Sequence, residues 1–326
     1  MTNIVTATAR ETPQARSAPR RALRRPVVPE VLRSDDVPAA ELRTGLRNGT
    51  LVRVAPGVIG HAPPSEPRWQ RSEGLQLLGV RATSRRLSTP FWFSHETAAL
   101  LWGCRVWRPG AEVHVTQLSK PPQDKLPKVH RHADALPEAD RTVVGGLPVT
   151  SLVRTALDCA CSMTPERALP VVDSALFAGA DLASLVAQAD DAVGRRGIRL
   201  ARRVIALADA RSDSVGESRT RWQLAAAGLP APDLAIPVET FLGTRWVDLG
   251  WPDLKVGIEF DGAIKYSGGE YGDPRRRLLD EKRRHDALVE AGWIIVRVTW
   301  EDLADPERLV ARVRAALAAG RRRRRT

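Results

Sequence analysis

The stretch RWVDLGWPDLKVGIEFDGAIK, residues 245–265, contains two short apolar segments separated by a turn that carries a proline. The tripeptide Trp-Pro-Asp at 251–253 favours a tight turn. We therefore expect residues 245–251 and 256–261 to form an antiparallel hairpin, with the turn at 251–255.

The hairpin is predicted to gather acidic side chains on one face, because side chains alternate along a strand. In the second strand, Glu259 and Asp261 point away from the apolar residues. In the first strand, Val247 and Leu249 point to one side and Asp248 to the other. Pairing about the turn sets Asp248 opposite or diagonal to Glu259, so three carboxylates crowd one patch.

Three carboxylates on one patch of a sheet predict a metal site. Like charges across a sheet destabilise it, and an all-oxygen ligand set suits a hard cation, Mg²⁺ or Mn²⁺. Lys265 follows Asp261 closely enough to place an ammonium beside a scissile phosphate. The predicted chemistry is metal-assisted phosphodiester hydrolysis. The alternative is that these acids line the solvated face of an antiparallel sheet.

The rest of the C-terminal part repeats a recognisable order of motifs. A helix with the sequence SVGESRTRWQLAAAGL precedes the Asp248 strand, and the segment Glu259-Phe-Asp261-Gly262 follows it. A long helix, 273–291, and a strand, 293–299, complete the order. Residues 212–304 resemble the DUF559 and very-short-patch-repair-like branch of the PD-(D/E)xK nuclease superfamily.

This resemblance implies a restriction-endonuclease-like fold, with a mixed central sheet flanked by helices, and metal ligation by Asp248, Glu259 and Asp261, with Glu217 completing the set. For Lys265 we expect, from its position after Asp261, stabilisation of the charge that develops on the phosphate. The superfamily's usual lysine two positions after the glutamate is Asp261 in this chain.

The long helix after the hairpin is rich in arginine. We expect Asp273 to cap it and Gly292 to end it in a left-handed conformation. Its basic residues are candidates for holding a nucleic-acid backbone; they are Arg275, Arg276, Arg283 and Arg284. The alternative is a solvated helix face that pairs with neighbouring acids.

The net charge of +12 is concentrated at the two ends of the chain. Residues 1–26 hold six arginines and one glutamate, and Arg321 to Arg325 are five consecutive arginines. By contrast, residues 212–320 contain 15 basic and 18 acidic residues. We expect 1–26 and 321–326 to be disordered or solvated basic tails that contact phosphate without specificity.

Residues 27–60 predict a helix followed by a hairpin, the ending of a winged helix. Asp36 is the expected cap of a helix through Arg47 that stops at Asn48-Gly49, and LVRVAPGVI turns at Ala-Pro-Gly. The segment resembles the N-terminal winged helix of AbiEi-type antitoxins. That resemblance implies DNA contacts by Arg43, Arg47 and Arg53. The alternative is a small structural cap on the next domain.

Residues 61–210 predict a mixed, mainly helical middle domain that also resembles the AbiEi type. Strands at EVHVT and PKVHRH bring His114, His130 and His132 onto neighbouring strands. These histidines are either metal ligands or, as we consider commoner, members of a polar sheet face. The tryptophans of this domain are expected to pack in its core; they are Trp92, Trp102 and Trp107.

Together these patterns predict an α/β (α+β) protein that acts as a metal-dependent DNA endonuclease. Its expected partners are DNA and a toxin or other protein, with no membrane. The alternative is a non-catalytic DNA-binding regulator of the antitoxin type, from a type IV toxin–antitoxin or phage-defence system. The three cysteines lack zinc-ligand spacing and indicate a reducing cytoplasm.

Overall fold

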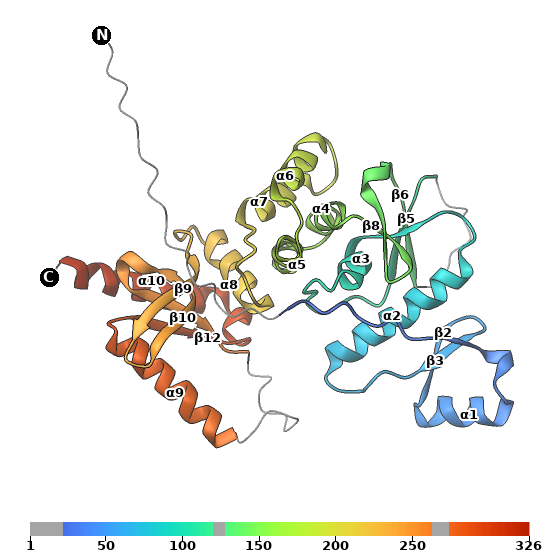
Figure 1. The fold of residues 1–326 in the computed structure, drawn as a ribbon, viewed down its shortest axis with the longest axis horizontal. Helices are drawn as coiled ribbons and strands as arrows, with labels where there is room; N and C mark the ends of the chain where they lie inside the picture. The colour runs from blue at the N-terminus through green and yellow to red at the C-terminus, as the bar shows by residue number, and fades with distance from the viewer. Residues whose placement is uncertain (1–21, 120–127, 263–273, 326) are drawn as a thin grey trace, which may run out of the picture.

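A computed structural model describes residues 22–119, 128–262 and 274–325. Of residues 274–278 it describes the backbone alone. The chain is an α+β protein with three separate sheets of three, five and four strands in these residues. The N-terminal and C-terminal parts lie at opposite ends of the long axis, and the middle part lies between them (Figure 1). In the described residues no helix is both long and apolar enough to cross a membrane.

The N-terminal part contains one α-helix and a small antiparallel sheet with strand order β1-β3-β2. Its elements are β1 (Leu32–Arg33), η1 (Ser34–Asp36), α1 (Ala39–Asn48), β2 (Leu51–Ala55) and β3 (Val58–His61). Gly49, with φ 76°, ends α1 as predicted, and the hairpin turns at Pro56-Gly57. The prediction that Asp36 caps α1 is wrong: Asp36 lies in the turn η1 and Pro38 occupies the cap position.

The N-terminal sheet lies against the first helix of the middle part. A Cβ at Gly60 of β3 would lie 2.5 Å from the Leu78 side chain of that helix. The guanidinium groups of Arg81 and Arg85 in the same helix donate to the backbone carbonyls of Val28 and Val31. This packing is what the structural-cap interpretation expects, and it leaves DNA binding by the segment as a prediction.

The expected boundary of the N-terminal tail at residue 26 is too late. The Arg25 guanidinium lies over the Trp102 ring, 5.1 Å from its centroid. A Cβ at Gly103 would also meet the Arg24 backbone. Residues 22–26 therefore pack on the middle part, since the Trp102 ring offers a cation–π surface.

The middle part pairs a five-stranded sheet with a bundle of helices. The sheet order is β6-β5-β4-β8-β7, with β5 parallel to β6 and β4 parallel to β8. Its strands are β4 (Trp92–Phe93), β5 (Val113–Gln117), β6 (Val129–Ala133), β7 (Arg141–Val144) and β8 (Leu147–Thr150). Its helices are α2 (Arg68–Arg86), α3 (His95–Leu101), α4 (Leu152–Ser162), α5 (Pro165–Phe177), α6 (Leu182–Asp191) and α7 (Ile198–Leu207), with η2 (Glu138–Asp140) between β6 and β7.

Local signals set the ends of these helices. The Ser151 hydroxyl accepts from the backbone N–H of Arg154 at the start of α4, and the Asp181 carboxylate does the same for Ser184 at the start of α6. Trp102 packs against the core of the helices, and its indole N–H donates to the Thr150 carbonyl at 3.1 Å. The prediction that Trp102 belongs to the core is confirmed.

The C-terminal part is a four-stranded mixed sheet flanked by helices, as predicted. Its order is β12-β11-β10-β9, antiparallel except for the parallel pair β11 and β12. The strands are β9 (Asp233–Thr240), β10 (Gly243–Trp251), β11 (Val256–Phe260) and β12 (Ile294–Val298). The helices are α8 (Val215–Ala226), α9 (Pro274–Glu290) and α10 (Pro306–Arg325), with short turns η3 (Pro252–Leu254) and η5 (Asp302–Ala304).

Helices cover both faces of this sheet. Leu224 of α8 and Leu309 and Val313 of α10 pack on one face, in a cluster with Leu249 and Ile258. Leu288 of α9 packs on the other face with Val247, Trp293 and two residues of β9. Gly292 follows α9 at φ 87°, as predicted.

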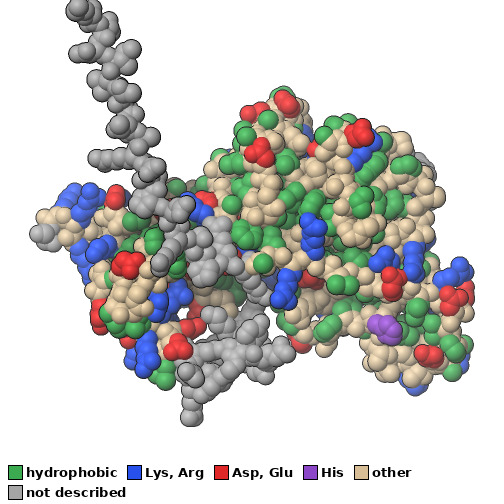
Figure 2. Space-filling model, viewed as in Figure 1, with side chains coloured by type: hydrophobic (Ala, Val, Ile, Leu, Met, Phe, Trp, Pro, Cys, Tyr) green, Lys and Arg blue, Asp and Glu red, His purple; other side chains and the backbone are tan. Residues whose placement is uncertain are grey.

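The C-terminal arginines are solvated, as expected, but they belong to a helix. Arg321 to Arg325 continue α10 and are exposed. Alanine and arginine are strong helix formers, so the helix continues beyond its last packing residues. Figure 2 shows Lys and Arg side chains gathered at this end of the molecule.

Candidate functional site

The hairpin that the sequence predicts is present. η3 turns the chain at Pro252–Leu254, and the pairs Leu249↔Ile258 and Trp251↔Val256 fix the register. In this register Asp248 lies one step beyond Leu249, opposite Glu259. The predicted neighbourhood of these two carboxylates is therefore confirmed.

The predicted facing of β10 is wrong at one point. Val247 packs on the α9 face of the sheet, whereas Leu249 packs on the α8 and α10 face. The β9–β10 pairing runs from Val247↔Ile236 to Leu249↔Leu234 without a pair between Asp248 and Ala235. Ala235 has φ 50°, so the regular pleat is interrupted there. Asp248 consequently sits at the point where the strand changes face.

Asp248 is held by the neighbouring strand. Its Oδ2 accepts a hydrogen bond from the Phe260 backbone N–H at 2.8 Å. Burial, together with the negative charge of Glu259, raises the pKa of Asp248 to about 6, against the opposing effects of this hydrogen bond and of Arg284. The carboxylate is fixed in place and carries a partly unrelieved charge.

Glu217 reaches the same region from α8. Ser214 caps this helix, since its hydroxyl accepts from the Glu217 backbone N–H at 3.1 Å. Gly216 lies against the Phe260 ring, leaving no room for a Cβ. This close approach brings the first turn of α8 onto the end of β11, beside Asp248.

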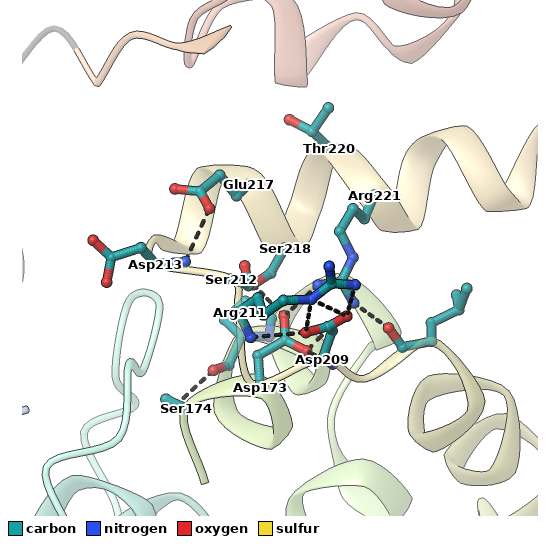
Figure 3. A network of polar contacts seen from close by, with 12 residues as sticks. Asp173, Ser174, Asp209, Arg211, Ser212, Asp213, Glu217, Ser218, Thr220 and Arg221 are labelled. Atoms are coloured by element: carbon teal, nitrogen blue, oxygen red, sulfur yellow. Dashed lines mark hydrogen bonds and ion pairs between the residues drawn. The ribbon is translucent and has the colours of Figure 1, made fainter. Parts of the chain in front are cut away.

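The Glu217 carboxyl is buried and strongly perturbed. Its Oε2 accepts from the Asp213 backbone N–H at 2.9 Å, on the side of α8 that faces away from the contacts of Asp173 (Figure 3). Burial and the nearby charge of Asp248 raise the pKa of Glu217 to about 8. Two acids from different elements therefore disfavour each other's ionisation.

Glu259 has a protein cation beside it. The Arg284 guanidinium of α9 lies 2.9 Å from Glu259 Oε1 and also donates to the Trp246 carbonyl at 2.7 Å. Only 14% of the Glu259 side chain is exposed. Arg284, predicted to hold phosphate, therefore compensates a site carboxylate in this structure.

The other predicted residues of this site are less tightly placed. The Asp261 backbone N–H donates to the Val298 carbonyl at 2.8 Å, which extends the parallel pairing by one residue, and its side chain is partly buried. Arg283 is exposed on α9. Lys265, Asp273 and the side chains of Arg275 and Arg276 lie outside the described residues.

The sequence interpretation missed Asp213. Its carboxylate pairs with Arg105 of the middle part at 2.9 Å, and its charge helps to raise the pKa of both Glu217 and Asp248. The signal was present in the order Asp-Ser-x-x-Glu at 213–217, where an acid directly precedes a capping serine.

The donor chemistry fits Mg²⁺ or Mn²⁺. All four candidate ligands offer carboxylate oxygen, and Glu217 and Asp248 both have the raised pKa that a nearby cation would relieve. Within the described part of the chain, however, one group of three side chains places all its ligand atoms within 4.8 Å, and that group consists of histidines. Among the described carboxylates, no three bring their ligand atoms this close together.

The predicted DNA contacts of the N-terminal part are exposed. Arg43 and Arg47 lie four residues apart on α1, and Arg53 lies on β2. Arg53 borders a shallow cleft together with Asp36 and Leu42. These positions are accessible to a partner.

No family model matches the chain. Two curated relatives, the uncharacterized proteins MT2308 and Rv2248 of Mycobacterium tuberculosis strains CDC 1551 and H37Rv, are each 34% identical over 176 residues. The match covers 52% of this chain and 62% of each relative, so the chain spans less than two thirds of their length. The crystal structure of the RV2827C protein of the same organism shows 18% identity and a TM-score of 0.34, over 64% of this chain and 79% of that chain. A TM-score of this size supports no argument about a shared fold.

Proposed function

We propose that this chain is a metal-dependent endonuclease that cuts or nicks DNA at the Asp248–Glu259 end of its C-terminal sheet. The observation that carries the proposal is the convergence of Glu217 and Asp248 from different elements. Burial raises the pKa of both groups. The charge of Asp248 raises the pKa of Glu217 further, and the charge of Glu259 does the same for Asp248. Clusters of buried, mutually repelling carboxyls are typical of catalytic and metal sites.

Asp248 and Glu259 are the residues that would hold Mg²⁺ or Mn²⁺, with Asp261 at the open end of β11. The ion, when bound, supplies Lewis acidity toward a phosphate oxygen and a water molecule. In the absence of a bound ion, Glu217 has a pKa of about 8 and keeps its proton at neutral pH, and a cation held by Asp248 and Glu259 would lower this pKa. Arg284 sits where it can exchange Glu259 for a phosphate oxygen, since a guanidinium binds either anion.

A plasmid-nicking assay tests the proposal. Full-length protein is incubated with supercoiled DNA and Mg²⁺ or Mn²⁺, and relaxed circles are expected. Asp248→Asn and Glu259→Gln should each reduce the rate at least about 100-fold, the scale of losing a central electrostatic contact. Asp253→Asn is the matched control, since Asp253 lies in the turn of the same hairpin and its side chain is 87% exposed.

The outcome that would overturn the proposal is equally concrete. If folded wild-type protein leaves duplex, single-stranded and mismatched DNA intact with both ions, the enzyme assignment is to be dropped. Equal nicking by wild type and both variants would trace the activity to a contaminant.

One observation favours a non-catalytic DNA-binding regulator as the second candidate. Arg284 pairs with Glu259 at 2.9 Å and Asp261 stands where the superfamily has lysine, so a protein cation occupies the neighbourhood of the expected metal. Binding to the DNA upstream of its own gene, without cleavage under any divalent ion, is the result expected of that regulator. A toxin or other protein partner and a cytoplasmic location belong to this same proposal.

A further inference from the structure

A cluster of histidines lies in the middle part, away from the carboxylate site. Four of the six histidines of the chain are there: His95, His114, His130 and His132. The parallel register of β5 and β6 pairs His114 with His130 and Thr116 with His132. His114, His130 and His132 therefore face the same side of the sheet. His95, the first residue of α3, stacks on the His132 ring at a centroid distance of 3.7 Å.

Two ring nitrogens of the cluster already have the separation of metal ligands. His114 Nδ1 and His132 Nε2 are 3.0 Å apart. Two nitrogens that bind one zinc ion tetrahedrally at about 2.0–2.1 Å lie about 3.3 Å from each other. One ring nitrogen of His95 lies within 4.8 Å of both of these nitrogens.

The remaining contacts of His95 fix which nitrogen is left for a ligand. His95 Nδ1 lies 2.9 Å from the Ser94 hydroxyl and 3.9 Å from Asp158 Oδ2. Asp158 is fully buried; its Oδ1 accepts from Arg154 and Arg195, while its Oδ2 has no hydrogen-bond partner among the described residues. A carboxylate that faces the far nitrogen of a histidine is the usual support of a metal-binding imidazole. Nε2 of His95 is then the ligand atom.

A further observation agrees with this arrangement. His95 has φ 52°, a conformation that a non-glycine residue keeps only when its surroundings impose it.

We infer that His95, His114 and His132 form a site for a transition-metal dication, Zn²⁺ by the chemistry of its three imidazole donors, with a fourth position for water. The site joins α3 to the β5–β6 edge of the sheet. It is independent of the carboxylate site, because imidazole favours Zn²⁺ whereas carboxylate oxygen favours Mg²⁺ and Mn²⁺. His130 lies at the exposed rim of the cluster, with its side chain 53% exposed.

Zinc titration of full-length protein, stripped of metal with a chelator, tests the inference. Calorimetry is expected to show one tight Zn²⁺ site per chain, and Zn²⁺ should raise the melting temperature. His114→Gln and His132→Gln should each weaken the tight site at least about tenfold, the lower end of what loss of a supporting group costs. His61→Gln, which changes an exposed histidine at the end of β3, and Asp248→Asn should keep it.

X-ray absorption at the zinc edge of wild-type protein decides the matter even if a variant fails to fold. The inference requires about three imidazole nitrogens at about 2.0–2.1 Å. Lack of tight Zn²⁺ binding by wild type, an all-oxygen or thiolate shell, or unchanged binding in both folded histidine variants would each overturn it. In those cases the four rings are a hydrogen-bonded, stacked polar face without a metal.

Discussion

Glu217 has the most strongly raised pKa among the carboxyl groups of the candidate site. Burial and the charge of Asp248 raise its pKa to about 8, against an ordinary value of 4.5. The folded state therefore holds a proton that the unfolded chain releases above about pH 4.5. Between these two values the folded protein loses stability as the pH rises.

Glu217→Gln should remove this loss, because glutamine is neutral at every pH and still offers an oxygen to the Asp213 N–H. We expect the melting temperature of the variant, relative to wild type, to rise from pH 5 to pH 8. Each kcal/mol corresponds to about 2–4 °C in proteins of about 150–250 residues and to less in this longer chain. Thermal melts by circular dichroism in the presence of a chelator measure the difference. If the difference in melting temperature between variant and wild type is the same at pH 5 and pH 8, the Glu217 carboxyl is not buried as described.

At the scale of single residues, the sequence predicted side chains that belong to a regular pattern. The alternation in β11 placed Glu259, and the hairpin register placed Asp248 beside it. Asp213 and His95 escaped because their roles depend on neighbours from other elements: Arg105 and Glu217 for the first, His132 and Asp158 for the second. No local spacing encodes those contacts.

At the scale of elements, α8 contributes side chains to two hydrophobic cores. Trp222 packs with the helices of the middle part, whereas Leu224 packs with the C-terminal sheet. Its polar residues are buried as well: the Ser218 hydroxyl donates to Asp173 of α5 at 2.6 Å, and Arg221 pairs with the same carboxylate (Figure 3). A helix buried on all sides has no apolar stripe, so periodicity could not reveal its partners.

The close approach of α8 to β11 depends on Gly216. Gly216→Ala should force the Phe260 ring out of its place and disturb its edge contact with Trp300, at 5.0 Å between centroids. We expect a loss of about 1–3 kcal/mol, typical of overpacking, although alanine is the better helix former. Chemical denaturation measures it. Phe260→Leu on the same background should restore part of the stability; if Gly216→Ala alone is stabilising, the contact does not limit α8.

Turns and the helix ends that stop at glycine were predicted well at this scale, because proline and glycine act locally, whereas the predicted Asp36 cap of α1 was wrong. The turn at 251–255 and the left-handed Gly49 and Gly292 are examples. The change of face at Asp248 was not predicted, since it follows from the φ of 50° at Ala235, a residue type that gives no such signal.

At the scale of the whole molecule, the middle and C-terminal parts share α8 and a stack of side chains. The Arg219 guanidinium lies over the Trp107 ring at 3.7 Å from its centroid, and Trp300 runs parallel to Trp107. The predicted boundary at 210–211 therefore falls before a helix that both parts need. The boundary was drawn in the polar segment before α8, but residues of that segment contact the middle part: the Arg105 guanidinium donates to the Ser212 carbonyl and pairs with Asp213. Composition alone does not reveal such contacts.

The distribution of charge over the whole molecule sets how it meets DNA under the proposed function. Residues 212–320 hold 15 basic and 18 acidic residues, so attraction by the C-terminal part depends on Arg321 to Arg325 and on local patches such as the basic residues of α9. The exposed Arg321 to Arg325 form the last turns of α10, a rigid base for phosphate contact. Within this run, Arg324 lies 4.0 Å from the exposed carboxylate of Asp253.

Replacing Arg321 to Arg325 by alanine keeps the helix and removes five charges. Each lost phosphate contact lowers the slope of log K against log[salt] by about 0.9, so the slope should fall by up to about 4.5 if all five contact DNA. Fluorescence anisotropy with a duplex at several salt concentrations measures this slope. Replacement by five lysines is the matched control and should keep it, because counterion release depends on charge. An unchanged slope in the alanine variant, with the fold intact by circular dichroism, would show that α10 points away from bound DNA and would move the electrostatic contact to α9 or the N-terminal part.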